Sequence, residues 1–523
     1  MHAALRNNRL APKHYWPLQW LCGMYNITMT TSFGAGARLS DFSEVPNSMS
    51  VNQRNVLLIC VDQWRGDALS CEGHPVVMTP FLDQLAGDGV RFTRAYSATP
   101  TCIPARASLY TGLSQTSTGR VGYQDGVDWN YPCTVASEFT RNGYQTQAIG
   151  KLHVYPERSQ MGFQNVILHD GYLHFARRKP RDVGLADDYL PWLRNQTGNP
   201  TADYFDNGLN CNSQVARPWD KDEALHPSTW IVSEGQDFLR RRDTRKPFFL
   251  YLGFHRPHQP YDPPAWAFEQ YLNCPMPPPV LGGWADDAFT SYNDEWRADP
   301  SFATLSPRAL QRARAGYFGH MSHIDLLINR FLESLAEYGE RQNTIVCFVS
   351  DHGEMLGDHG AFRKGLPYEG SARVPLLLSG PGIPRRTVCN DRVVELRDVM
   401  PTLLQAAGLP VPDGLDGRSV LPLGEGVSSW RSYLHGEHLA CGQSLHWLTD
   451  GHWKYIWWSG TGREQLFNLD VDPNELHDQS DDGAVEIWRT RLVQQLTGRE
   501  EGFVQDGSLV VGCPVRPILS KLR

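Results

Sequence analysis

The stretch Asn55-Val-Leu-Leu-Ile-Cys-Val61, followed at once by Asp62-Gln63, decides the fold of this chain. An almost unbroken apolar run of this length fits a strand that is buried on both faces, as in a parallel sheet covered by helices. Further runs share this character, and each also ends in a polar cluster: Tyr144 to Ile149 before Gly150-Lys151-Leu152-His153, Phe248 to Gly253 before His255-Arg-Pro-His258, and Thr344 to Val349 before Asp351-His352-Gly353. We therefore predict a strand at each of these positions, all in one sheet.

Helical patterns lie between these runs. From His320 to Tyr338 apolar side chains recur on one helical face until Gly339 stops the pattern, and Thr79-Pro80 is typical of the start of another helix. This alternation predicts the α/β class, here a large mixed, mainly parallel sheet flanked by helices. Because ligands bind outside the carboxyl ends of the strands in such sheets, we expect the polar clusters to converge there.

The character of the sequence changes near residue 420. Gly451 to Trp458 and Glu464 to Leu469 indicate strands joined by a turn, and residues 484–497 have a helical pattern. These features predict a smaller C-terminal α+β subdomain. The predicted organisation is an N-terminal extension (1–50), a main domain (51–420), the C-terminal subdomain (421–500) and a C-terminal tail (501–523).

The composition is that of a soluble globular protein, with 41% of the 523 residues hydrophobic and 20% charged. The formal net charge of -8 argues against nucleic acid or an acidic membrane surface as the main partner. No apolar run reaches the roughly 18–20 residues that span a bilayer, and Pro17 interrupts the patch from Trp16 to Tyr25, which makes it a poor signal-peptide core. We expect a cytoplasmic protein without a membrane partner. Residues 1–48 are either a true extension or a misassigned start before Met49.

The eleven cysteines are spread singly along the chain without a CxxC pair, so zinc-ribbon and thioredoxin classes have no support. A reduced compartment is the simpler interpretation of this pattern. Cys60 and Cys347 lie within apolar runs and are predicted to be buried, inert thiols.

Cys102-Ile-Pro-Ala-Arg106 is the most informative motif in the chain. A proline after a loop cysteine can start a helix, which would place Cys102 at a helix N-terminus, where negative charge and bound anions are favoured. Arg106, one turn further on, would reach back toward the same point and hold an anion. Taken alone, the motif also fits an ordinary loop cysteine that precedes a helix.

Together with the downstream Leu109-Tyr-Thr-Gly112, this motif resembles the signature of the type I, formylglycine-dependent sulfatases of the alkaline-phosphatase-like superfamily. The resemblance extends through the order and spacing of the other clusters, from residue 55 to about 475, and is close to the arylsulfatase and phosphonate monoester hydrolase branch. It implies that a formylglycine-generating enzyme oxidises Cys102 to formylglycine. Ile103 departs from the small or polar residue that is usual after the cysteine, which puts the efficiency of this modification in doubt.

The resemblance also implies one divalent cation. Its ligands would be Asp62, Gln63, Asp351, His352 and the oxygen of the formylglycine at Cys102. Many sulfatases have Asp where this chain has Gln63 and Asn where it has His352. Fewer carboxylates and one imidazole make the site softer, so calcium and manganese both remain candidates.

The remaining catalytic residues are also assigned by resemblance. Lys151 matches a lysine that contacts the diol and the ester oxyanion, His153 a base, His258 the histidine of the leaving group, and Lys364 a lysine that binds the sulfate. Phosphonate monoester hydrolases are expected to carry Tyr and Thr in place of Lys151 and His153, so this pair favours sulfate esters. His255 is equally compatible with a supporting and with a purely structural role.

These assignments imply a mechanism. A formylglycine hydrate carries two hydroxyls on one carbon, of which one attacks the sulfur and the other is deprotonated by His153 so that the carbonyl re-forms and sulfate leaves. The function predicted is hydrolysis of a small-molecule sulfate monoester. The alternatives are a phosphonate monoester or phosphodiester hydrolase on the same fold, and a non-catalytic anion-binding protein. A homo-oligomer, with the two terminal segments as assembly arms, is a further expectation.

Overall fold

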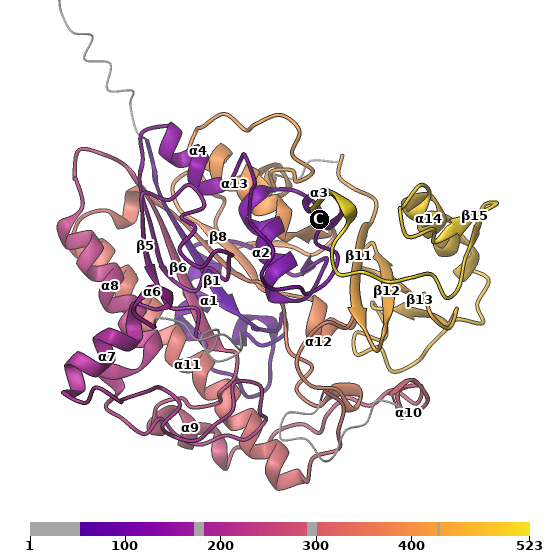
Figure 1. Ribbon diagram of the computed structural model, residues 1–523, viewed down its shortest axis with the longest axis horizontal. Coiled ribbons are helices and arrows are strands. Elements are labelled where there is room, and N and C mark those ends of the chain that lie inside the picture. Colours follow the sequence, from indigo (N-terminus) through magenta and orange to yellow (C-terminus); the bar gives the residue numbers. More distant parts are fainter. Residues whose placement is uncertain (1–52, 172–182, 290–300, 426–428, 523) are drawn as a thin grey trace, which may run out of the picture. The chain divides into compact units, whose positions relative to one another are not determined.

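The computed structural model describes residues 53–171, 183–289, 301–425 and 429–522. Within them, an eight-stranded sheet has the strand order β5-β4-β6-β1-β7-β8-β2-β9 (Figure 1). Its strands are β1 (Asn55–Asp62), β2 (Gly89–Phe92), β4 (Gln145–Gly150), β5 (Asn165–Leu168), β6 (Phe248–Pro257), β7 (Thr344–Ser350), β8 (Leu376–Ser379) and β9 (Thr387–Cys389). Because β8 is antiparallel to both of its neighbours and the other pairs are parallel, the sheet is mixed but mainly parallel, as predicted.

The four long apolar runs form adjacent strands of this sheet. β1 pairs in parallel with β6 on one side and with β7 on the other, and β4 lies beyond β6. Alternate side chains of β1 enter two different cores, Leu57, Ile59 and Val61 on one face and Val56, Leu58 and Cys60 on the other. All of these residues are fully buried. Burial on both faces explains why the run is continuously apolar instead of alternating with polar residues.

Helices cover both faces of the sheet (Figure 1). The face that contains Leu57 packs against α1 (Pro80–Gly87), α7 (Tyr189–Thr197), α8 (Pro227–Arg241), α9 (Ala265–Leu272) and α11 (Pro307–Glu337). The opposite face packs against α2 (Cys102–Thr111), α4 (Val135–Arg141) and α13 (Val399–Ala406). Shorter helices are α3 (Gln115–Thr118), α6 (Val183–Ala186), α10 (Ala285–Phe289) and α12 (Glu369–Ala372).

Helix α11 begins at Pro307, whereas the apolar pattern predicted a start at His320. Ser306 Oγ accepts a hydrogen bond from Ala309 N at 3.3 Å, and Pro307 occupies the first helical position. A capping serine followed by proline is a standard helix start, which the apolar pattern alone missed. The predicted start of α1 at Thr79-Pro80 and the predicted burial of Cys60 and Cys347 are confirmed.

The C-terminal part of the chain forms a separate antiparallel sheet. It consists of β11 (Leu434–Ala440), β12 (Gln443–Thr449), β13 (Trp453–Trp458) and β14 (Glu464–Asn468). Helix α14 (Val485–Leu496) packs on this sheet. The strands β13 and β14 and the helix were predicted, whereas the more polar β11 and β12 were not. Two small pairs complete the strands, β3 (Ala95–Tyr96) with β10 (Val394–Glu395) and β15 (Val504–Gln505) with β16 (Ser508–Leu509).

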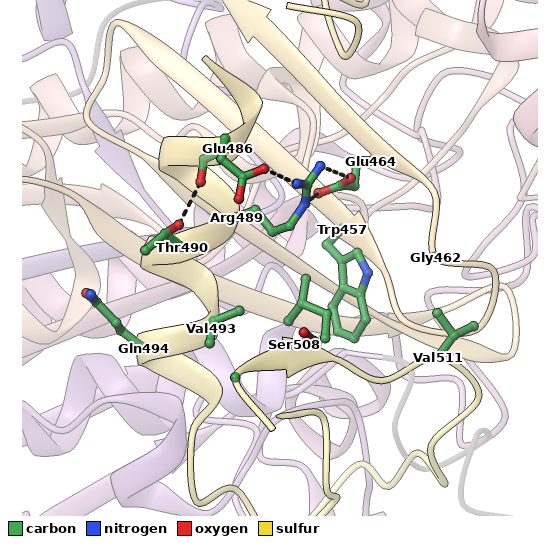
Figure 2. A pocket seen from close by; sticks show the side chains of 12 residues that line it. Trp457, Gly462, Glu464, Glu486, Arg489, Thr490, Val493, Gln494, Ser508 and Val511 are labelled. Atoms are coloured by element: carbon green, nitrogen blue, oxygen red, sulfur yellow. Dashed lines mark hydrogen bonds and ion pairs between the residues drawn. The ribbon is translucent and has the colours of Figure 1, made fainter. Parts of the chain in front are cut away.

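A buried ion-pair network connects this sheet to the main domain. Lys454 Nζ on β13 lies 2.7 Å from Glu369 Oε1 on α12 and 2.8 Å from Glu475 Oε1. A pocket of about 610 Å³ lies elsewhere on the C-terminal sheet, between β13, α14 and the β15–β16 hairpin (Figure 2). Its arginine, Arg489, is paired with Glu464 and Glu486. In the described part of the chain, no helix has both the length and the apolarity needed to cross a membrane.

Candidate active site

The polar clusters that follow the central strands meet at one edge of the sheet. Asp62 is the last residue of β1, Asp351 and His352 follow β7, and Cys102 is the first residue of α2. Each of these four residues offers one ligand atom, and these atoms lie within 4.8 Å of one another. All four side chains are buried. The structure therefore brings together the residues that the sequence predicted around Cys102.

The thiol of Cys102 lies among cationic and acidic groups. Its Sγ is 3.2 Å from His352 Nε2, 3.8 Å from Asp62 Oδ1 and 4.0 Å from Lys151 Nζ. Burial and the Asp62 carboxylate raise the pKa of this thiol, but Lys151, Lys364 and His352 outweigh them and lower it below its ordinary value. The position therefore favours a negatively charged oxygen or sulfur atom on residue 102.

Asp62 is held as an anion in this cluster. Its carboxylate forms an ion pair with Lys151 Nζ, and both side chains are fully buried. Burial raises the pKa of Asp62, but the positive charges of Lys151 and Lys364 outweigh this effect, so the pKa of Asp62 lies well below its usual range. His352 Nε2 lies 3.3 Å from Asp62 Oδ1.

These residues fit a divalent cation. His352 Nδ1 lies 3.0 Å from Gly353 O, an arrangement that fixes the imidazole and leaves Nε2 directed at Asp62 and Cys102. Two carboxylates, one imidazole nitrogen and one atom of residue 102 form a compact, water-excluded donor set. Such a mixture of oxygen and nitrogen donors suits a divalent metal ion.

Arg106 lies one helical turn after Cys102, and its guanidinium contacts Asp351. Its Nε lies 2.9 Å from Asp351 Oδ2, and its Nη1 donates to Lys151 O at 3.0 Å and to Tyr251 OH at 2.9 Å. Its Nη2 is buried and has no hydrogen-bond partner among the described residues. Arg106 thus fixes Asp351, a proposed metal ligand, and its Nη2 group remains available to donate a hydrogen bond to a bound ligand.

Gln63 and Lys364 contact each other at the side of this cluster. Lys364 Nζ donates to Gln63 Oε1 at 2.7 Å, and Gln63 Nε2 donates to Gln259 Oε1 at 2.8 Å and to Glu354. The two acceptors for Nε2 fix the orientation of the amide, because they leave its oxygen on the side of the lysine.

His258 and His153 follow β6 and β4 and are both fully buried. His258 Nδ1 lies 3.0 Å from Gln259 O, and burial together with the charge of Lys364 lowers the pKa of its imidazole well below the usual range. The ring of His153 is in edge-to-face contact with Tyr123, at 6.1 Å between centroids. Its backbone, two residues after Lys151, is left-handed with φ 59°.

Comparison with known proteins decides the family. Residues 54–409 match the family model described as Sulfatase, and residues 357–501 match that of the C-terminal region of N-sulphoglucosamine sulphohydrolase. The chain is a member of the sulfatase family. An arylsulfatase of Clostridium perfringens (strain 13 / Type A) is 48% identical to this sulfatase over 477 residues, which cover 88% of this chain and 98% of that protein. Arylsulfatase K of Rattus norvegicus is 30% identical over 81% of this chain and 74% of its own length.

The fold of this sulfatase is shared with proteins of known structure. The phosphonate monoester hydrolase of Agrobacterium radiobacter superposes with a TM-score of 0.69 and 27% sequence identity, covering 85% of this chain and 94% of that one. The prediction of an alkaline-phosphatase-like α/β fold is thereby confirmed. The sulfatase is accordingly a sulfuric ester hydrolase, in agreement with the motif analysis and against the alternative of a non-catalytic binding protein.

Sequence reasoning missed several residues that support the site of the sulfatase. They are Tyr110, Asp170, Tyr251, Arg256, Gln259, Asp262 and Glu354, all buried. Glu354 follows the Asp351-His352-Gly353 motif directly, and this position was the one available signal for it. Tyr110 and Arg256 lie inside the quoted stretches Leu109-Tyr-Thr-Gly112 and His255-Arg-Pro-His258, but no role was assigned to them there. Asp170, Tyr251, Gln259 and Asp262 lie outside the motifs, and only the fold brings them close.

A second histidine cluster has a structural role in the sulfatase. His226, Asp262 and His320 are buried and place ligand atoms within 4.8 Å of one another. However, the carboxylate of Asp262 already pairs with Arg256, whose Nε lies 2.9 Å from Asp262 Oδ1. His320 Nε2 accepts a hydrogen bond from Asp262 N at 3.0 Å. We therefore interpret this cluster as the anchor of the segment that carries His258.

Proposed function

We propose that this sulfatase hydrolyses aryl-type sulfate monoesters to phenol or alcohol and inorganic sulfate, with a formylglycine derived from Cys102 as nucleophile and one divalent cation as cofactor. The observation that carries the proposal is the buried group of Asp62, Cys102, Asp351 and His352, with ligand atoms within 4.8 Å and Lys151 beside it. The 48% identity to a protein named arylsulfatase, over nearly its full length, supports the aryl substrate class.

The proposed metal ligands are Asp62, Gln63, Asp351, His352 and an oxygen of the modified residue 102. The bound cation would supply positive charge at the sulfate group and would acidify a hydroxyl of the hydrated aldehyde. The donor chemistry is compatible with calcium and with manganese, and the choice between them is an experimental question.

The modified residue would supply two hydroxyls on one carbon, one for attack and one for release of sulfate. A formylglycine-generating enzyme is therefore the proposed maturation partner. Peptide mass spectrometry around residue 102 of the purified protein tests this step. An unmodified cysteine in a fully active preparation would disprove it.

The remaining roles follow from charge and position. Lys151 and Lys364 provide ammonium groups near Asp62 and would bind the sulfate oxygens, where negative charge accumulates. Arg106 would fix Asp351 through its ion pair. His258 would donate the proton to the departing oxygen, and His153 would accept the proton of the second hydroxyl.

A phosphonate monoester hydrolase is the second candidate, because solved structures of that activity share this fold at 27% identity and a TM-score of 0.69. Lys151 and His153 favour sulfate, since Tyr and Thr are expected there in the phosphonate enzymes. Rates on 4-nitrophenyl sulfate and 4-nitrophenyl phenylphosphonate separate the two. Much faster cleavage of the phosphonate would overturn our ranking.

We propose a catalytic domain at 51–420 and a C-terminal subdomain at 421–500, between an N-terminal extension and a C-terminal tail. A cytoplasmic location is supported by the ten described cysteines, which are all free thiols.

We further propose a homo-oligomer. The end of the tail packs on its own chain, where Val121 N and Gly122 N donate to Pro517 O, so the first 50 residues are the better candidate for an assembly arm.

A further inference from the structure

The segment Lys151-Leu152-His153 leaves β4 without regular secondary structure, yet each of its backbone N–H groups has a defined acceptor. Lys151 N donates to Gly253 O at 2.8 Å. Leu152 N and His153 N both donate to the same atom, Asp170 Oδ1, at 2.8 and 2.9 Å. A single carboxylate oxygen therefore holds two consecutive residues of the segment that carries the proposed lysine and base.

The carbonyl groups of this segment are held in the same way. Lys151 O accepts hydrogen bonds from Arg106 Nη1 and Tyr251 OH, each at 3.0 Å, and Leu152 O accepts one from Tyr110 OH at 3.1 Å. These partners are fully buried side chains from α2 and β6. Apart from the backbone hydrogen bond from Lys151 N to Gly253 O, the position of the segment thus depends on specific side chains.

The backbone conformation of His153 explains why this segment needs a carboxylate to stabilise it. Its φ of 59° is in the left-handed region, which residues other than glycine rarely adopt. Such conformations persist only where surrounding contacts impose them, and they are frequent at functional sites. Successive N–H groups that turn toward one point form a concave anion-binding nest, and Asp170 provides the anion.

We infer that Asp170 is a positioning residue of the reaction, an inference that rests on the proposed function. Asp170 lies just beyond β5, the neighbour of β4, and only 3% of its surface is exposed. By fixing Leu152 and His153, it keeps Lys151 Nζ beside Asp62 and Cys102 and fixes the backbone from which the His153 imidazole extends. The edge strand β5 thereby contributes to catalysis without supplying a residue that touches substrate.

The chain offers a matched control in Asp325. This carboxylate is 1% exposed and also accepts two consecutive backbone N–H groups, from Phe81 at 3.2 Å and Leu82 at 2.7 Å. It does so at the start of α1, outside the site described above. Asp325→Ala removes the same kind of interaction, so it reports what the loss of a doubly bonded buried carboxylate does to the fold alone.

The test compares Asp170→Ala, Asp170→Asn and Asp325→Ala in the metal-loaded enzyme, with kcat and KM on 4-nitrophenyl sulfate and a thermal midpoint for each. We expect Asp170→Ala to lower kcat about 100-fold with little change in KM, the effect of a displacement of about 1 Å. Asp170→Asn keeps an acceptor oxygen and should recover most of kcat. Asp325→Ala should lower the midpoint and leave kcat unchanged. Equal kcat in Asp170→Ala and Asp325→Ala, or no recovery by Asp170→Asn, overturns the inference.

A double-mutant comparison separates this inference from the proposed function. If Asp170 acts through Lys151 and His153, Asp170→Ala lowers kcat less in Lys151→Ala or in His153→Ala than in the wild type, and no further in the variant that lacks both side chains, whereas an independent structural effect multiplies. Unchanged kcat in both Lys151→Ala and His153→Ala contradicts the proposed function itself. Low kcat in those two variants with normal kcat in Asp170→Ala contradicts only the positioning role.

Discussion

Arg106 and Asp351 form an ion pair in which neither side chain has any exposed surface, with Arg106 Nε 2.9 Å from Asp351 Oδ2. The pair joins helix α2, which begins at Cys102, to the segment directly after β7, which contains the proposed metal ligands Asp351 and His352. Burial of a charge is costly unless it is paired and hydrogen-bonded. Residue 102, the proposed nucleophile, and the proposed cation site are therefore held in one rigid unit.

Arg106→Ala should destabilise the metal-free protein by about 3–5 kcal/mol, because it leaves the Asp351 carboxylate buried without its counter-ion. The free energy of unfolding in urea, measured in the presence of a chelator, checks this. The control is Arg245→Ala, which removes an ion pair with Asp243 whose arginine is 84% exposed and should leave stability unchanged. Equal stability of Arg106→Ala and wild type would show that the buried pair contributes nothing.

Cys102→Ser should take up one sulfuryl group per active site and then stop, because serine has a hydroxyl for attack but no second hydroxyl on the same carbon for release. Cys102→Ala should show neither event. Intact-protein mass spectrometry after incubation with 4-nitrophenyl sulfate, together with the amount of 4-nitrophenol released, measures both. Sustained turnover by Cys102→Ser at a near wild-type rate would refute the release step proposed for His153.

Removal of the metal should abolish hydrolysis of the sulfate ester and should also lower the midpoint temperature of thermal unfolding. A ligand that binds only the folded state at 100 times its Kd stabilises it by about 2.7 kcal/mol. Titration of the chelated enzyme with calcium or manganese then identifies the cofactor by recovery of both quantities. His352→Ala should weaken the recovery by either ion, with the metal content measured directly. Full activity after exhaustive chelation would contradict the metal proposal.

The sequence predicted the part of the site that rests on strand order. Apolar runs buried on both faces identify parallel strands, and the polar residues after them must then meet at one sheet edge. This reasoning predicts that Asp62, Lys151, His258 and Asp351 lie at one edge of the sheet. The motif around Cys102 added the chemistry and the family.

The sequence could not predict contacts that depend on the paths of loops. Asp170 has no motif of its own, and its role follows from the distance between its oxygen and two amides of another strand's loop. Likewise, the pairing of Arg106 with Asp351 instead of an anion at residue 102 depends on the exact turn of α2. The polar strands β11 and β12 were missed because their burial depends on tertiary packing: Leu445 and Trp447 of β12 pack in the cluster that includes Tyr96 and Tyr368, and Leu448 packs in the cluster that includes α14.

Acid should destabilise the enzyme through Glu437, a buried carboxylate outside the active site. Burial raises its pKa, but Arg499, with two hydrogen bonds of 2.9 Å, lowers it from 4.5 to about 2. As the pH falls, Glu437 is protonated in the unfolded chain before it is protonated in the folded protein. The stabilisation by its carboxylate is therefore complete above pH 4.5 and is lost as the pH falls toward 2. This difference in pKa between the unfolded and the folded state corresponds to about 3 kcal/mol of folding stability. Glu437→Gln should therefore flatten the dependence of unfolding free energy on pH in this window, whereas the exposed Glu486→Gln should not. Parallel pH curves for wild type and Glu437→Gln would rule out this linkage.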